Sequence, residues 1–210
     1  MKLLRKIILP VLLAAILLLA VRGLLLCHMR LPDNAALPGL EPGGHVLVCL
    51  TYYGLRLPGE QLWGYHRWGY AEPEVMDNVV FAPSATAGKP PEVPFMAGTC
   101  RAVPGDTVWI DPVRRLVLPA RTSPDAQPIV VPGKGRSVHV TPHNARLLAW
   151  LLQTYEHSRV TLTREGGLQM AGSRLTRVKT SQNYYWIETQ PDSFRLVPHC
   201  ELVGKIVSQF

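Results

Sequence analysis

Four residues in this sequence could supply a nucleophile and a base. Cys49 or Cys100 could act as a thiol nucleophile, with His45 or His199 as the imidazole base. A single thiol and a single imidazole in a domain built of strands are far more often packing residues than a catalytic pair. We therefore interpret these four side chains as structural.

Other candidates for chemistry are weaker. Asp33 and Glu41 could form a pair of carboxylates, but both lie in a connector that is rich in proline and glycine. No cysteine stands in a CxxC or His–Cys spacing, so we expect no metal and no other cofactor. Cys49, Cys100 and Cys200 allow at most one disulfide among them. We expect small buried thiols instead.

The chain is organised around residues 94–110, PFMAGTCRAVPGDTVWI. They predict a strand, a tight turn at Pro104-Gly105-Asp106, and a second strand over residues 107–110. Proline presets φ at the first turn position, glycine tolerates a positive φ, and aspartate can accept hydrogen bonds from nearby backbone N–H groups. The β-branched and aromatic residues after the turn favour a half-buried strand.

An apolar run over residues 7–27 is long enough for a bilayer span and follows Lys2, Arg5 and Lys6. The positive-inside rule places the N-terminus in the cytoplasm and the rest of the chain outside. No small-residue cleavage site precedes Cys27 and His28, which argues against a cleaved signal peptide. The sequence thus predicts a single-pass anchor in the inner membrane, with the following domain in the periplasm.

The 210 residues suit one domain of moderate size, and the net charge of +7 is scattered without stacking aromatic residues. We therefore expect no nucleic-acid partner. Short runs of β-forming residues predict a mostly β domain over residues 29–210, after a cytoplasmic tip and anchor over residues 1–28. A helical insertion is expected over residues 141–157, with Thr141 as its cap and Pro142 in its first turn.

Six ordered blocks resemble type I signal peptidases, in particular the form found in Bacteroidetes. PGLEPGGHVLV at residues 38–48 resembles the family's P-T-L-x-x-G-D-x-V-L-V, and YGLRLP at 53–58 its Y-G-x-R-L-P. DNVVF at 77–81 is similar to G-D-I-V-V-F, and Pro104-Gly105-Asp106 stands where the family has K-R-x-x-G-x-P-G-D. The segment 131–156 resembles the helical insertion, and residues 183–186 and 197–205 resemble the closing motifs. The resemblance implies a membrane-anchored serine endopeptidase that processes signal peptides during protein secretion, with a serine nucleophile and a neutral lysine as base.

The residues that the resemblance requires for catalysis are missing. Counted from Pro38, the nucleophile position holds Ala35, and an alternative register puts His28 there. Counted from Pro104, the base position holds Gly98. The third family motif is shortened here, and it retains only Asp192, Ser193 and Arg195. Loss of both nucleophile and base leaves no route to an acyl-enzyme.

Three hypotheses follow from these vacancies. The first is a pseudo-peptidase that binds signal peptides or assists an active signal peptidase paralogue, since strand addition of a peptide needs neither serine nor lysine. The second is an active signal peptidase with displaced catalytic residues. The third is a structural envelope protein. Side chains that fill the space around Ala35 and Gly98 would mean that the family's peptide groove is lost.

Overall fold

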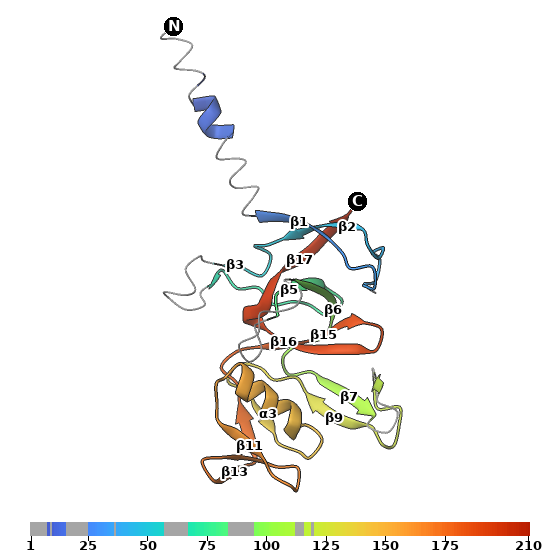
Figure 1. The fold of residues 1–210 in the computed structure, drawn as a ribbon, viewed down its shortest axis with the longest axis vertical. Coiled ribbons are helices and arrows are strands. Elements are labelled where there is room, and N and C mark those ends of the chain that lie inside the picture. Colours follow the sequence, from blue (N-terminus) through green and yellow to red (C-terminus); the bar gives the residue numbers. More distant parts are fainter. Residues whose placement is uncertain are drawn as a thin grey trace.

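The computed structural model describes residues 8, 10–15, 25–35, 37–56, 67–83, 95–111, 116–118 and 120–210. A seven-stranded antiparallel sheet forms its centre (Figure 1), in the order β1-β2-β17-β5-β6-β15-β16. Its strands are β1 (Leu26–Arg30), β2 (His45–Cys49), β5 (Asn78–Phe81), β6 (Met96–Ala102), β15 (Tyr184–Gln190), β16 (Ser193–Pro198) and β17 (Leu202–Gln209). The prediction of a mostly β fold is confirmed.

Four smaller sheets and several helical segments complete the described chain. The sheets are β3 (Leu55–Arg56) with β4 (Arg67–Trp68), β7 (Thr107–Asp111) between β8 (Leu116–Leu118) and β9 (Gln127–Val130), β10 (Ser137–His139) with β14 (Arg177–Lys179), and β12 (Leu168–Met170) between β11 (Val160–Leu162) and β13 (Ser173–Leu175). After β1, the helices of the described chain are α3 (Ala145–Thr154) and the short 3₁₀ turn η2 (His199–Glu201).

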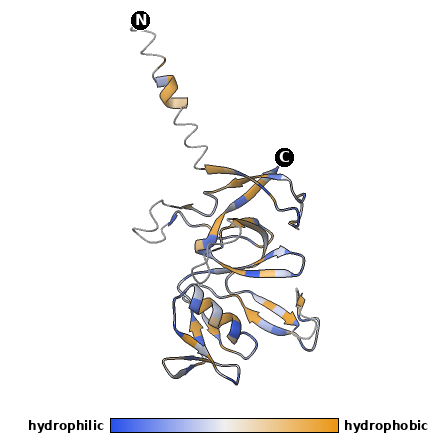
Figure 2. Cartoon of the chain, viewed as in Figure 1, coloured by the Kyte–Doolittle hydropathy of each residue, from blue (hydrophilic) through white to orange (hydrophobic). Residues whose placement is uncertain are grey.

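The central sheet buries both of its faces, and hydrophobic residues alternate with more polar ones along its strands in Figure 2. Side chains of a strand alternate between faces, so the paired residues Val80 and Ala97 lie on one face and the paired residues Val79 and Gly98 on the other. On the first face, Val80 and Ala97 pack with the connector around residues 31–37. On the second, Val79 packs in a cluster that includes Tyr185 and Ile187.

The predicted helical insertion is present as α3, which buries Leu148, Leu151 and Leu152 in a third hydrophobic cluster. The predicted cap is wrong, because the helix begins three residues later than expected. Asn144 is the N-cap residue, and its side chain accepts a hydrogen bond from the Thr141 backbone N–H at 2.8 Å. Thr141 therefore belongs to the turn that precedes the helix.

The prediction of a transmembrane anchor also needs correction. No helix in the described part of the chain is long and apolar enough to cross a membrane. This finding overturns the expected spanning helix, and it does not support the single-pass arrangement and the inner-membrane location that we inferred from that helix. Residues 10–15 are helical, whereas residues 1–7, 9 and 16–24 lie outside the described residues. Cys27, expected at the membrane boundary, lies in β1 opposite Val48 of β2.

The aromatic segment at residues 61–70 is described only from residue 67 onward. Trp68 is 76% exposed, whereas the ring of Tyr70 lies 4.5 Å from that of His199. Tyr70 is itself 58% exposed and packs one side of its ring against the 3₁₀ turn η2.

Candidate functional site

The turn at Pro104, Gly105 and Asp106 has the predicted structure. Gly105 adopts a φ of 98°, which favours glycine, and the Asp106 carboxylate accepts a hydrogen bond from the Val103 N–H at 2.9 Å. The carbonyl of Pro104 accepts one from the Arg136 guanidinium at 2.9 Å. The turn joins β6, the strand of the central sheet that contains Gly98, to β7 of a separate three-stranded sheet.

The vacated nucleophile position is buried. Ala35 is 5% exposed and shares a hydrophobic cluster with Leu31, Leu37 and Ala97. Its backbone N–H donates to the Pro32 carbonyl at 3.0 Å, which holds the connector in a turn against the sheet. A side chain at this position faces the sheet and not solvent.

The vacated base position lies on the opposite face. A Cβ atom added to Gly98 would collide with the Cγ2 of Ile187 and would lie 2.6 Å from the carbonyl oxygen of Glu188. No lysine side chain fits there without displacing β15. The two positions that the sequence singles out are therefore both filled, and they face away from each other.

Polar groups close the remaining space on the Ala35 face. Asn78 donates from Nδ2 to the Pro38 carbonyl at 3.2 Å, and its Oδ1 accepts a hydrogen bond from the buried Thr99 hydroxyl at 2.9 Å. These bonds tie the connector to β5 and β6. The Thr99 hydroxyl thus has a structural role, as the donor of a hydrogen bond to Asn78.

The alternative register places His28 at the nucleophile position, and the structure puts it elsewhere. His28 lies in the edge strand β1 and is exposed. Its ring stacks on those of His45, at a centroid distance of 4.8 Å, and Phe210, at 5.5 Å. The rings of His28 and His45 therefore both belong to one aromatic stack with Phe210.

The structure shows no disulfide at any of the four cysteines, and Cys49 and Cys100 contact groups other than an imidazole. The Cys100 thiol donates to the carbonyl of Ala102, and burial, followed by the charge of Asp77, raises its pKa to about 12. Cys49 contacts the Thr51 hydroxyl at 3.7 Å. A thiol with so high a pKa as that of Cys100 is a poor nucleophile.

His199 contacts tyrosines. Its Nδ1 lies 3.4 Å from the Tyr185 hydroxyl, and Tyr70 packs on its ring. Burial, followed by the positive charge of Arg67, lowers its pKa to about 4. The residue is therefore a neutral packing histidine at physiological pH.

The remaining carboxylates and the third family motif also lack a catalytic arrangement. Asp33 forms an exposed ion pair with Arg30 at 3.3 Å, whereas Glu41 contacts Gln209 through its backbone. Asp192 has a φ of 59° in the β15–β16 turn, followed by the first residue of β16, Ser193. The Arg195 guanidinium, on the same strand, lies 3.8 Å from the sulfur of Met96.

A partly buried polar cluster was not predicted from the sequence. Asp77 receives a hydrogen bond from the Tyr53 hydroxyl at 3.2 Å and pairs with the Lys205 ammonium at 2.6 Å, and Lys205 also donates to Tyr52 at 3.2 Å. Burial opposes the charge on Lys205, but hydrogen bonds to Asp77 and Tyr52 outweigh it and raise the pKa of the lysine. Lys205 is thus fully protonated and cannot serve as a general base.

An apolar groove of about 500 Å³ opens beside the Pro-Gly-Asp turn. It is lined by Val75, Met76, Arg101, Ala102, Asp106, Thr107, Val108, Val117, Leu118, Trp186 and Phe194. The Trp186 and Phe194 rings stack with their centroids 6.0 Å apart. Arg101 donates to Glu188 at 2.6 Å and contacts the sulfur of Met76 at 3.0 Å. Apolar walls with a few polar groups are typical of ligand sites of this size.

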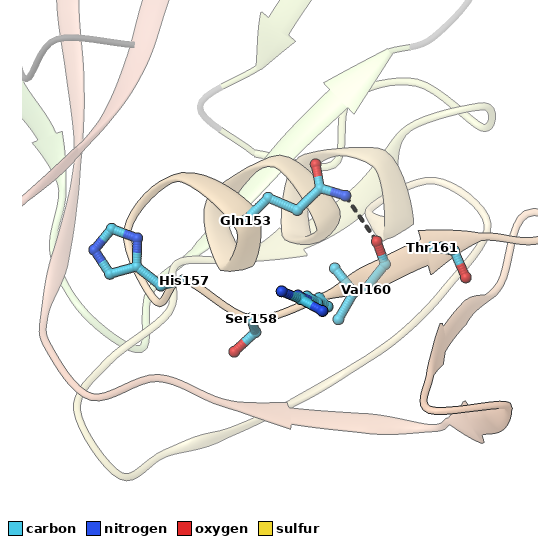
Figure 3. Close-up of a pocket in the computed structure, with 6 residues that line it drawn as sticks. Gln153, His157, Ser158, Val160 and Thr161 are labelled. Atoms are coloured by element: carbon cyan, nitrogen blue, oxygen red, sulfur yellow. Dashed lines mark hydrogen bonds between the residues drawn. The ribbon is translucent and has the colours of Figure 1, made fainter. Parts of the chain in front are cut away.

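A second hollow lies at the end of α3 (Figure 3). It brings Gln153, His157 and Ser158 together with residues 159–161. Gln153 donates to the Val160 carbonyl at 2.7 Å, and Ser158 donates to the Glu156 carbonyl at 3.3 Å. His157 and Ser158 point in different directions, so they form no nucleophile–base pair.

No protein-family model matches this chain, and no curated protein matches it.

Proposed function

We propose that this chain is a catalytically inactive, signal-peptidase-like protein that binds apolar peptide segments. The observation that carries the proposal is the burial of Ala35 and Gly98 on opposite faces of one sheet. A nucleophile and its base must lie within hydrogen-bond reach of each other. The second hypothesis, an active peptidase with displaced residues, also lacks support, because Cys100 is a buried thiol of raised pKa and Lys205 is protonated.

The peptide would bind beside the retained turn. The region of Gly98 offers no edge for strand addition, since β6 pairs with β5 on one side and β15 on the other. The apolar groove between β8, β15 and the Pro-Gly-Asp turn is instead open. Its walls suit the apolar side chains of an extended segment, such as the hydrophobic core of a signal peptide.

Two measurements test the proposal on the full chain. Incubation with a preprotein should yield no cleaved product. A labelled apolar peptide should bind, and Met76→Asp should weaken this binding about tenfold, or about 1.4 kcal/mol. Met76 is 54% exposed at the groove rim and has a φ of 77°, which aspartate tolerates. The matched control is Leu162→Asp, at a 47% exposed leucine outside the groove.

Cleavage of the preprotein would disprove inactivity. Absence of peptide binding, or equal loss of binding in both variants, would leave a structural protein as the better description.

A further inference from the structure

The positive charge of this chain is concentrated in one region. Residues 133–181 contain eight lysines and arginines and two glutamates, a net charge of +6 in a chain whose total is +7. All eight basic side chains are exposed. Glu156 is half-buried and accepts hydrogen bonds from the Ser181 N–H and the Tyr184 hydroxyl, which partly neutralise its charge locally. Such a surface attracts an acidic partner.

Within this region, the two-stranded sheet β10–β14 separates its apolar and charged residues by face. Val138 and Val178 are paired, and both are buried in the third hydrophobic cluster. Their neighbours point the other way. The opposite face therefore carries His139 beside Arg177 and Ser137 beside Lys179, all four exposed.

The hydrogen bonds of β14 leave one of its edges unpaired. The Val140 N–H donates to the Thr176 carbonyl, and the Gly135 N–H to the Thr180 carbonyl, so even-numbered residues of this strand direct their backbone groups toward β10. Backbone direction alternates along a strand. The N–H and C=O groups of Arg177 and Lys179 therefore point away from β10, and β14 has no second strand partner among the described residues.

The equivalent edge of β10 is partly used. The carbonyl of His139 accepts a hydrogen bond from the Asn144 amide at 2.8 Å. Of the two edges, β14 is thus the one that offers its backbone groups.

We propose that β14 is a docking edge for an extended acidic peptide, which adds to the β10–β14 sheet as a third strand. Backbone groups of Arg177 and Lys179 would pair with the peptide, as in other cases of strand addition. Their side chains are about 7 Å apart along the strand, so acidic residues at alternate positions of the peptide would lie directly opposite them.

Charge repulsion also disfavours a second copy of this chain as the strand that binds to β14. Pairing of β14 with β14 would set Arg177 and Lys179 against the same cations, and charged edge strands resist such pairing. This basic docking edge differs in chemistry and place from the proposed apolar groove, and each can be tested without the other.

The test measures binding of a labelled synthetic peptide of alternating glutamate and valine to the full chain. We expect Arg177→Glu/Lys179→Glu to weaken binding at least about tenfold relative to Arg164→Glu/Arg174→Glu. The second double variant changes the net charge equally, at exposed arginines outside β10 and β14. Equal loss in both would show that only overall charge matters and would overturn the proposal.

A second arm separates strand addition from simple attraction of a polyanion. The same peptide, N-methylated at the residues that would pair with β14, keeps its charge but lacks the donors. We expect it to bind at least about tenfold more weakly. If it binds as well as the parent peptide, or if a single-stranded oligonucleotide of equal charge competes equally well, strand addition is wrong.

Discussion

At the scale of single residues, His199 makes folding sensitive to acid. It is 5% exposed, and burial together with the nearby charge of Arg67 lowers its pKa from 6.5 to about 4. Between about pH 6.5 and pH 4, His199 therefore binds a proton in the unfolded chain but stays neutral in the folded chain. The stabilisation that neutral His199 provides is complete above pH 6.5 and is lost as the pH falls toward 4.

We expect the free energy of unfolding to drop by about 2 kcal/mol through this residue between pH 7 and pH 4.5. Urea unfolding at the two pH values measures it. His199→Gln should show a smaller drop than the parent chain, whereas the exposed His143→Gln should match it. An identical pH dependence in all three proteins would refute this role of His199.

The amino-acid sequence alone predicts part of the candidate site. The sequence alone shows that no serine lies near residue 35 and no lysine near residue 98. The face on which each position lies is not, because it depends on strand register, and a shift of one residue inverts it. The Asp77–Lys205 pair escaped notice for a related reason, since β17 brings together residues from distant parts of the chain.

At the scale of elements, α3 anchors the helical insertion to the hydrophobic cluster beneath it. Leu151 is fully buried there. We expect Leu151→Ala to lower the free energy of unfolding by about 3 kcal/mol, because it removes buried methyl groups and leaves a cavity. Leu162→Ala, on the exposed side of β11, should change it by less than about 0.5 kcal/mol. Similar losses in denaturant titrations of both variants would contradict this account.

Helical spacing of leucines predicted α3 because one apolar face repeats every three or four residues. The helix start was wrong because Thr141 and Asn144 both suit a cap, and only the contacts of Asn144 with the preceding turn decide between them. Strands β12, β13 and β14 are three residues each, too short for a pattern of period two to be recognised. The apolar run was expected to extend through Cys27, because hydropathy alone does not show that Leu26 and Cys27 pair with β2.

At the scale of the whole molecule, the two faces of the central sheet set what the chain can do chemically. Restoration of the missing residues by Ala35→Ser/Gly98→Lys should not produce cleavage of a preprotein. The serine would face Ala97, whereas the lysine would collide with Ile187 and the backbone of β15 on the other face. We also expect this variant to unfold at lower denaturant concentration than the parent chain, since no space exists for the lysine.

The matched variant is Ala35→Ser/Ala97→Lys, which introduces the same two side chains on one face. Ala97 is 6% exposed and shares the cluster of Ala35, so this lysine starts beside the serine, in a buried environment that lowers its pKa. If face geometry governs the chemistry, any cleavage that is recovered will appear in this variant alone. Cleavage by Ala35→Ser/Gly98→Lys would mean that β6 can present residue 98 to the connector, and that the separation of the two positions is not what prevents catalysis.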